Sequence, residues 1–189
     1  MYRRMSNAEQ EMVKLRNMAG YLKIDDENLL YAIAIETGEA WTWRWRVYLP
    51  AGYKYSWHMN WGDIPANGTS NNSGGSTSDG APRIKGTEAI VYLTLRKDPE
   101  NKWLLILTCQ STDEKSSLTI SVSDDVMKQI LNANMTEGQN IGEGKAVSCK
   151  LDKPVIFLKR RIGEKQPNGS WRSSQNPVPG IMVWLEAVP

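Results

Sequence analysis

Two neighbouring stretches, WTWRWRVYL at residues 41–49 and YKYSWHMNW at residues 53–61, carry the clearest pattern in the chain. In each stretch, apolar or aromatic residues alternate with mostly polar ones. A period of two places the residues of one kind on the same face of an extended strand. Both stretches are therefore predicted to be β-strands with one apolar face, and the chain is predicted to be rich in β-sheet.

The three residues between these strands, Pro50-Ala51-Gly52, favour a hairpin turn. Pro50 and Ala51 suit a type I turn, and Gly52 suits the left-handed position that follows it. In such a hairpin Trp45 faces Trp57, and all the apolar side chains lie on one side. Turn chemistry and alternation thus predict the same register.

Other apolar stretches predict further strands and one helix. Strands are expected at 29–35, 88–96, 103–110, 117–123, 146–151, 154–161 and 180–187. Ser123 is a suitable N-cap for a short helix over 124–133. The predicted fold is mainly β: an antiparallel β-sandwich or open barrel of about eight strands, with an N-terminal α-helix and one short internal helix.

The 189 residues are predicted to hold an N-terminal helix, 1–22, and a single β-rich domain, 23–189. A flexible insertion is expected at 62–87, because most of that stretch is Gly, Ser, Asn and other turn formers. In the N-terminal helix, Met, Ala and Leu recur at heptad spacing. This amphipathic stripe either forms a coiled-coil seam, through which the chain associates with itself, or packs on its own domain.

Composition excludes several classes of function. The chain has 23 Lys and Arg against 21 Asp and Glu, a net charge of +2, which gives no reason to expect nucleic acid as a partner. One His and two Cys supply few metal ligands, and phosphate-loop motifs are absent, so we expect no metal and no cofactor. Neither a transmembrane run nor a secretion signal is recognisable. Cys109 and Cys149 either pair or stay reduced.

Arg44, Arg46, His58 and Trp171 are candidates for ligand binding. In the predicted hairpin Arg44 lies opposite His58 on the polar face, where guanidinium groups suit an anion or carboxylate. A solvated sheet face is the alternative. Trp171 lies in a polar loop. Its ring is either exposed as a contact for a partner or packed on the domain, where it would hold the loop in place. The basic run 159–161 is expected to be a strand end that reaches solvent.

The tryptophan stripe has two interpretations. It forms the apolar face of its hairpin, so most of its members are expected in the core. Exposed, the same rings would stack on sugars, as in a carbohydrate-binding module. The stripe comprises Trp41, Trp43, Trp45, Trp57 and Trp61.

The block WRWRVYLPAG, residues 43–52, resembles a block in uncharacterised bacterial proteins of the planctomycete type. Those proteins combine an N-terminal membrane-spanning helix, a short coiled coil and a small β-rich domain. The resemblance covers residues 10–65 and implies a location in the cell envelope, but it implies no activity and no catalytic residues. This sequence departs from that pattern because it lacks the membrane helix, so either the anchor is missing or Met1 is not the natural start.

We therefore expect a non-enzymatic, envelope-associated interaction or assembly module. Its partners would be a second copy, through the N-terminal helix, or another protein or a glycan. A membrane would be reached only through a missing N-terminal anchor. The first alternative is a carbohydrate-binding β-sandwich module, and the second is a hydrolase that uses unrecognised acidic residues.

Overall fold

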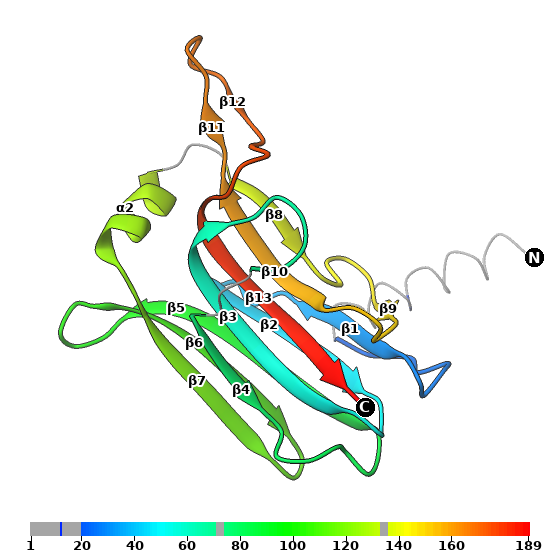
Figure 1. The fold of residues 1–189 in the computed structure, drawn as a ribbon. Helices are drawn as coiled ribbons and strands as arrows, with labels where there is room; N and C mark the ends of the chain where they lie inside the picture. Colours follow the sequence, from blue (N-terminus) through cyan, green and yellow to red (C-terminus); the bar gives the residue numbers. More distant parts are fainter. Residues whose placement is uncertain (1–11, 13–19, 71–73, 133–135) are drawn as a thin grey trace, which may run out of the picture.

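The structure, a computed structural model, describes residues 12, 20–70, 74–132 and 136–189. This part of the chain is mainly β, with two antiparallel sheets and one short helix (Figure 1). The N-terminal helix predicted over 1–22 lies almost wholly outside the described residues. None of the described helical segments has the length and apolar character needed to cross a membrane.

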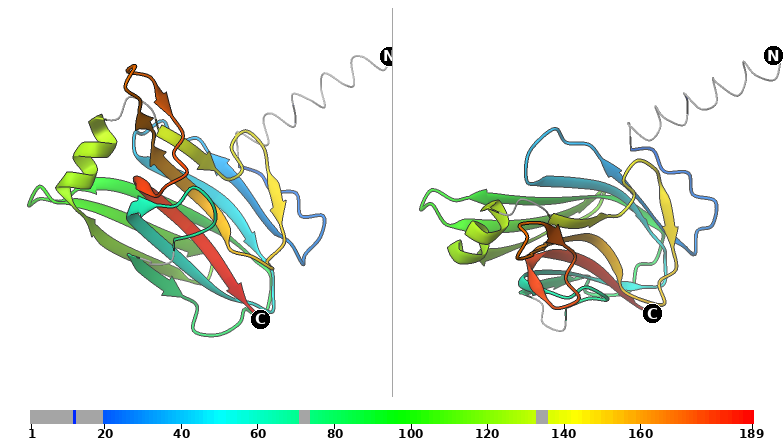
Figure 2. Two further views of the ribbon diagram at one scale, coloured as in Figure 1. Left: turned by 45° about the horizontal axis from the view of Figure 1, so that its top comes forward. Right: turned by 90° about the horizontal axis from the view of Figure 1, so that it is seen from above.

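The two sheets form separate layers, with the helix at one end (Figure 2). The six-stranded sheet comprises, in spatial order, β7 (Lys115–Val122), β6 (Trp103–Ser111), β5 (Thr87–Lys97), β2 (Thr42–Leu49), β1 (Leu30–Ile35) and β9 (Val147–Cys149). The five-stranded sheet comprises β4 (Gly75–Ser78), β3 (Lys54–Ile64), β13 (Val178–Val188), β10 (Val155–Ile162) and β8 (Thr136–Asn140). Among the described strands no ladder joins the two sheets, so the fold is sandwich-like and not a closed barrel.

The predicted hairpin between 41–49 and 53–61 is wrong, because the two strands belong to different sheets. Strand β2 pairs with β1 and β5, whereas β3 pairs with β4 and β13. The side chains of Trp45 and Trp57 instead point from their own sheets into the core between them. Both rings contact Phe157 there, at centroid distances of 5.7 and 4.8 Å. Alternation determines which face of a strand is apolar. A chain that crosses between layers buries that face as well as a hairpin does.

Several local predictions are confirmed. The strands expected at 88–96 and 103–110 form as β5 and β6, which pair with each other inside the six-stranded sheet. The internal helix, α2 (Asp124–Asn132), begins after Ser123, whose Oγ accepts a hydrogen bond from the Val126 amide at 3.3 Å. Its buried residues, Met127 and Ile130, turn toward the core.

The stretch 62–87, predicted to be a flexible insertion, includes paired strands among its described residues. It contains the end of β3 and the edge strand β4, which pairs with β3. The Nζ of Lys159 donates hydrogen bonds to the carbonyls of Ala66 and Gly68, and Arg83 binds both carboxylate oxygens of Asp79. A polar, glycine-rich segment can still pair as an edge strand, because ladder hydrogen bonds use only the backbone.

Other strands were not predicted from the sequence. Strand β8 has the polar sequence TEGQN. Strands β11 (Glu164–Lys165) and β12 (Trp171–Arg172) form a short hairpin that projects from the domain (Figure 1). Both lie in the stretch between β10 and β13, where the apolar residues are too few to produce an alternating pattern.

The two cysteines are both free thiols. Cys109 lies on β6 and Cys149 on β9, and three strands separate them in the six-stranded sheet. At about 4.8 Å per strand, the separation is roughly 19 Å, which is too far for a disulfide.

Candidate functional site

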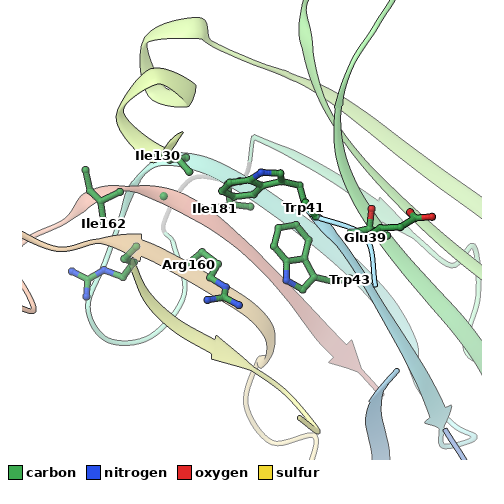
Figure 3. Close-up of a pocket in the computed structure, with 11 residues that line it drawn as sticks. Glu39, Trp41, Trp43, Ile130, Arg160, Ile162 and Ile181 are labelled. Carbon is green, nitrogen blue, oxygen red and sulfur yellow. The ribbon is translucent and has the colours of Figure 1, made fainter. Parts of the chain in front are cut away.

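A cavity of about 270 Å³ opens at the end of the sheets near α2 (Figure 3). Its walls come from segments far apart in the sequence: β2, α2, β10 and β13. The main lining side chains are Trp41, Trp43, Ile130, Arg160, Ile162 and Ile181.

Two indole rings form one wall of the cavity. Trp41 and Trp43 pack edge to face, with ring centroids 6.2 Å apart and an interplanar angle of 77°. Both are half-buried. Trp41 has a φ of 60°, a left-handed conformation that is uncommon for a bulky residue. Its carbonyl accepts a hydrogen bond from the Leu95 amide at 2.9 Å, so the neighbouring strand holds this strained residue in place.

The opposite wall is apolar and closely packed. Ile181 and Ile130 are buried, and Ile162 is half-buried. Beside Ile181, Gly180 allows β13 and β10 to approach closely: a β-carbon there would lie 2.1 Å from the Arg160 carbonyl oxygen. Any larger residue at position 180 would force these two strands apart.

Arg160 supplies the cation of the cavity. In the ladder it lies between Ile181 on β13 and Gly138 on β8. Its guanidinium lies over Gly138, where a β-carbon would come within 2.7 Å of Nη1, and it extends toward the side occupied by Trp43 (Figure 3). Among the described residues, this half-buried guanidinium has no hydrogen-bond or ion-pair partner. None of its nitrogen atoms is both buried and unpaired, so the guanidinium is open to water, and to an anionic ligand, at the cavity.

The neighbouring cations show the opposite arrangement. Arg161 and Lys159 are buried, at 3% and 7% exposure, so the prediction that residues 159–161 reach solvent as a strand end is wrong. Arg161 donates to the carbonyls of Ile64, Ser174 and Asn176 at 2.8–3.0 Å. Burial and the nearby charge of Arg161 lower the pKa of Lys159. These two cations hold loops against the outer face of the five-stranded sheet.

The residues proposed as ligand contacts from the sequence do not meet in one place. Arg44 and Arg46 lie on the outer face of β2, and Arg44 is opposite Ile35 and Tyr92 in the ladders. His58 lies on the outer face of β3, in the other sheet. The predicted opposition of Arg44 and His58 is wrong because the hairpin that would create it does not form.

His58 and Trp171 have local surroundings of their own. The His58 ring stacks on Trp184, with centroids 5.1 Å apart, and its Nε2 lies 3.4 Å from Glu186 Oε2. Trp184 Nε1 also donates to Glu186, at 3.0 Å. Trp171 is half-buried on the projecting β12. Neither residue borders the cavity near α2.

The five tryptophans of the stripe differ in burial and in position. Trp45 and Trp57 are buried, as the core interpretation predicts. Trp41, Trp43 and Trp61 are half-buried, and the first two line the cavity. The sequence signals for this site were therefore the tryptophans at the start of 41–49. The sequence contained no signal for Arg160, whose neighbours in the site come from other strands.

In the described part of the chain, no group of three or more His, Cys, Asp or Glu side chains is placed to hold a metal ion. The main groups of the site are thus two indoles, three isoleucines and the guanidinium of Arg160, and Glu39, Thr42 and Arg161 also belong to the lining. Comparison of the chain with family models, with curated proteins and with solved structures gave no match.

Proposed function

We propose that the protein is a non-catalytic binding module whose ligand, free or as part of a larger partner, occupies the cavity near α2. One observation carries this proposal: Trp41, Trp43 and Arg160 line the same cavity, and the guanidinium of Arg160 has no acceptor among the described residues. Indole rings contribute large contact areas with little conformational entropy to lose, and a guanidinium without an acceptor in the protein can form charge-assisted hydrogen bonds to an anionic partner. The indole rings and the guanidinium together therefore favour the binding of a ligand.

The chemistry of the lining supports binding over hydrolysis. Among the described lining residues the only carboxylate is Glu39, which is exposed, and the only side-chain hydroxyl is that of Thr42. A glycosidase needs two carboxyl groups on opposite sides of its substrate, and a nucleophilic hydrolase needs an activated nucleophile with a base beside it. The location in the cell envelope, and self-association through the N-terminal helix, stay predictions from the sequence.

A carbohydrate-binding module is the second candidate. The half-buried faces of Trp41 and Trp43 favour it, because indole rings stack on sugar rings. A sugar also presents several hydroxyl groups, which call for polar partners, and the described lining has few of these. The carbohydrate hypothesis is therefore less well supported than a ligand with an apolar body.

The test is a ligand-binding measurement by NMR on the whole chain, with a panel of small apolar, anionic, cationic and sugar compounds. We expect at least one class to produce saturable shifts at Trp41, Trp43 and Ile181. The shifts at Trp41 and Ile181 should disappear in Trp43→Ala. The matched control is Trp103→Ala, which removes another half-buried indole that does not line the cavity.

Two results would overturn the proposal. One is the absence of saturable binding at the cavity by every class at millimolar concentration. The other is an equal loss of binding in Trp43→Ala and in Trp103→Ala with both variants folded, because the effect would then not belong to the cavity.

A further inference from the structure

We infer that the ligand of this cavity is a compact apolar carboxylic acid: a single carboxylate on an aromatic or branched aliphatic body. The acid is either a free small molecule or the C-terminal residue of a peptide. This inference rests on the proposed binding function and names the chemistry of its ligand.

The anionic group follows from the environment of Arg160. Within the described structure its guanidinium has no acceptor, whereas the next residue, Arg161, is bound by three carbonyl groups. A guanidinium carries five N–H donors in a planar fork, which matches the two oxygens of a carboxylate. A ligand carboxylate would supply the acceptors that the fold provides to Arg161 but does not provide to Arg160.

A single negative charge fits better than a phosphate. Glu39 lies at the exposed edge of the same cavity and would repel a dianion (Figure 3). Arg161, although it borders the cavity, directs its guanidinium to the carbonyls of Ile64, Ser174 and Asn176. Within the described lining, Arg160 is thus the one cation without an acceptor, and it would balance one carboxylate.

The apolar body follows from the rest of the lining. Ile130, Ile162 and Ile181 present hydrocarbon surface opposite the indoles of Trp41 and Trp43. The volume of about 270 Å³ lies just below the roughly 300–1,000 Å³ typical of pockets for drug-sized ligands. Because a cavity of about 150 Å³ already binds benzene, this space accommodates one ring or one branched side chain together with the short chain that bears the carboxylate.

The test compares three probes of similar size by isothermal titration and NMR: 3-phenylpropionate, its isosteric neutral amide and the cationic 3-phenylpropylamine. We expect the acid to bind at least about tenfold more tightly than the amide, because a hydrogen bond to a charged group adds that much. The amine should bind most weakly. Arg160→Met should abolish the preference for the acid, and Arg160→Lys, which keeps the charge without the fork, should keep part of it.

The matched control is Arg96→Met, because Arg96 is an exposed arginine outside the cavity lining. It should leave the preference for the acid unchanged. Thermal unfolding of each variant, followed by circular dichroism, checks that a lost preference does not reflect lost folding.

Two peptide probes distinguish the sources of the acid. A short peptide that ends in phenylalanine is compared with its C-terminal amide. If the peptide acid binds more tightly than 3-phenylpropionate and its amide does not, the ligand is a peptide terminus. If the peptide acid binds more weakly, the ligand is a free acid.

Other outcomes would overturn the inference in separable ways. Equal binding of 3-phenylpropionate and its amide at the cavity would refute the carboxylate while leaving the binding function intact. Tighter binding of glucuronate than of 3-phenylpropionate would refute the apolar body and favour carbohydrate. Failure of every probe to bind would reject the proposed function together with the inference.

Discussion

The guanidinium group of Arg160 lies against the backbone of Gly138 on the neighbouring strand, in the space that a β-carbon would occupy. A β-carbon at Gly138 would come within 2.7 Å of Arg160 Nη1. The atoms in the way belong to the end of a flexible side chain, so alanine at this position would move the guanidinium and leave the strands in place. The backbone at Gly138 does not have the positive φ that would make alanine strained.

Gly138→Ala should therefore weaken the binding of an apolar carboxylate about tenfold while changing the free energy of unfolding by less than about 1 kcal/mol. Titration with 3-phenylpropionate and urea denaturation measure the two quantities. Gly80→Ala is the control, because a β-carbon there meets no atom within 4 Å. Unchanged affinity in Gly138→Ala would show that the position of this guanidinium does not matter for binding.

The indole of Trp45 is expected to be a major contributor to stability. It is fully buried, packs edge to face on Phe157 and donates from Nε1 to Asn140 Oδ1 at 2.8 Å. Trp45→Ala should lower the free energy of unfolding by about 3–5 kcal/mol, because it leaves a large cavity between the sheets. Urea denaturation measures this change. Trp171→Ala, on the projecting hairpin, should cost under about 2 kcal/mol, and an equally small cost at Trp45 would contradict its core position.

Local patterns predicted the faces of the strands but not their partners. The alternation in 41–49 correctly separated the inward Trp45 from the outward Arg44. Gly52 does take the left-handed conformation expected of it, with a φ of 86°. Yet its amide bonds to the carbonyl of Arg83, in a crossing between layers and not in a hairpin. The same turn is compatible with a hairpin and with a crossing between the sheets. Which connection forms depends on the other strands that pair with the edges of β2 and β3.

The candidate site was less predictable than the fold for the same reason. Trp41 and Trp43 stood out in the sequence, but Arg160 lies within a basic run that is typical of a solvent-exposed strand end. Alternation along β10 sends Lys159 and Arg161 to one face and Arg160 to the other. Only the position of β10 beside β13 and α2 makes the second face a cavity, and that position involves contacts between distant segments.

Arg161 is predicted to hold two loops to the five-stranded sheet. Three of its hydrogen bonds reach the carbonyls of Ile64, at the end of β3, and of Ser174 and Asn176, before β13. Arg161→Met should lower the free energy of unfolding by about 3 kcal/mol, because it leaves these carbonyls without their donors. Urea denaturation measures the loss, and Arg172→Met, at an exposed position, is the control. A loss below about 1 kcal/mol would mean that water replaces the guanidinium without cost.

The thiol of Cys109 is expected to make the protein sensitive to alkaline pH. Burial raises the pKa of this thiol from 9.0 to about 11. Between these two values the unfolded chain has lost the Cys109 proton and the folded protein still holds it. Because the unfolded state then binds fewer protons, the free energy of unfolding falls as pH rises from about 9 to 11, and Cys109 contributes no pH dependence below that range.

Two other groups with shifted pKa values also affect the pH dependence of stability. Burial also raises the pKa of Tyr55, whose hydroxyl donates to the Pro50 carbonyl at 2.8 Å, and this adds to the fall. The lowered pKa of Lys159 acts in the opposite direction, because there the unfolded chain binds more protons. Cys109→Ala isolates the thiol, since both other groups are common to the variant and the wild type. Urea denaturation at pH 8, 9, 10 and 11 should give a shallower fall for Cys109→Ala, whatever the absolute stability of the variant. Parallel curves for the two proteins would show that the thiol titrates alike in the folded and unfolded states.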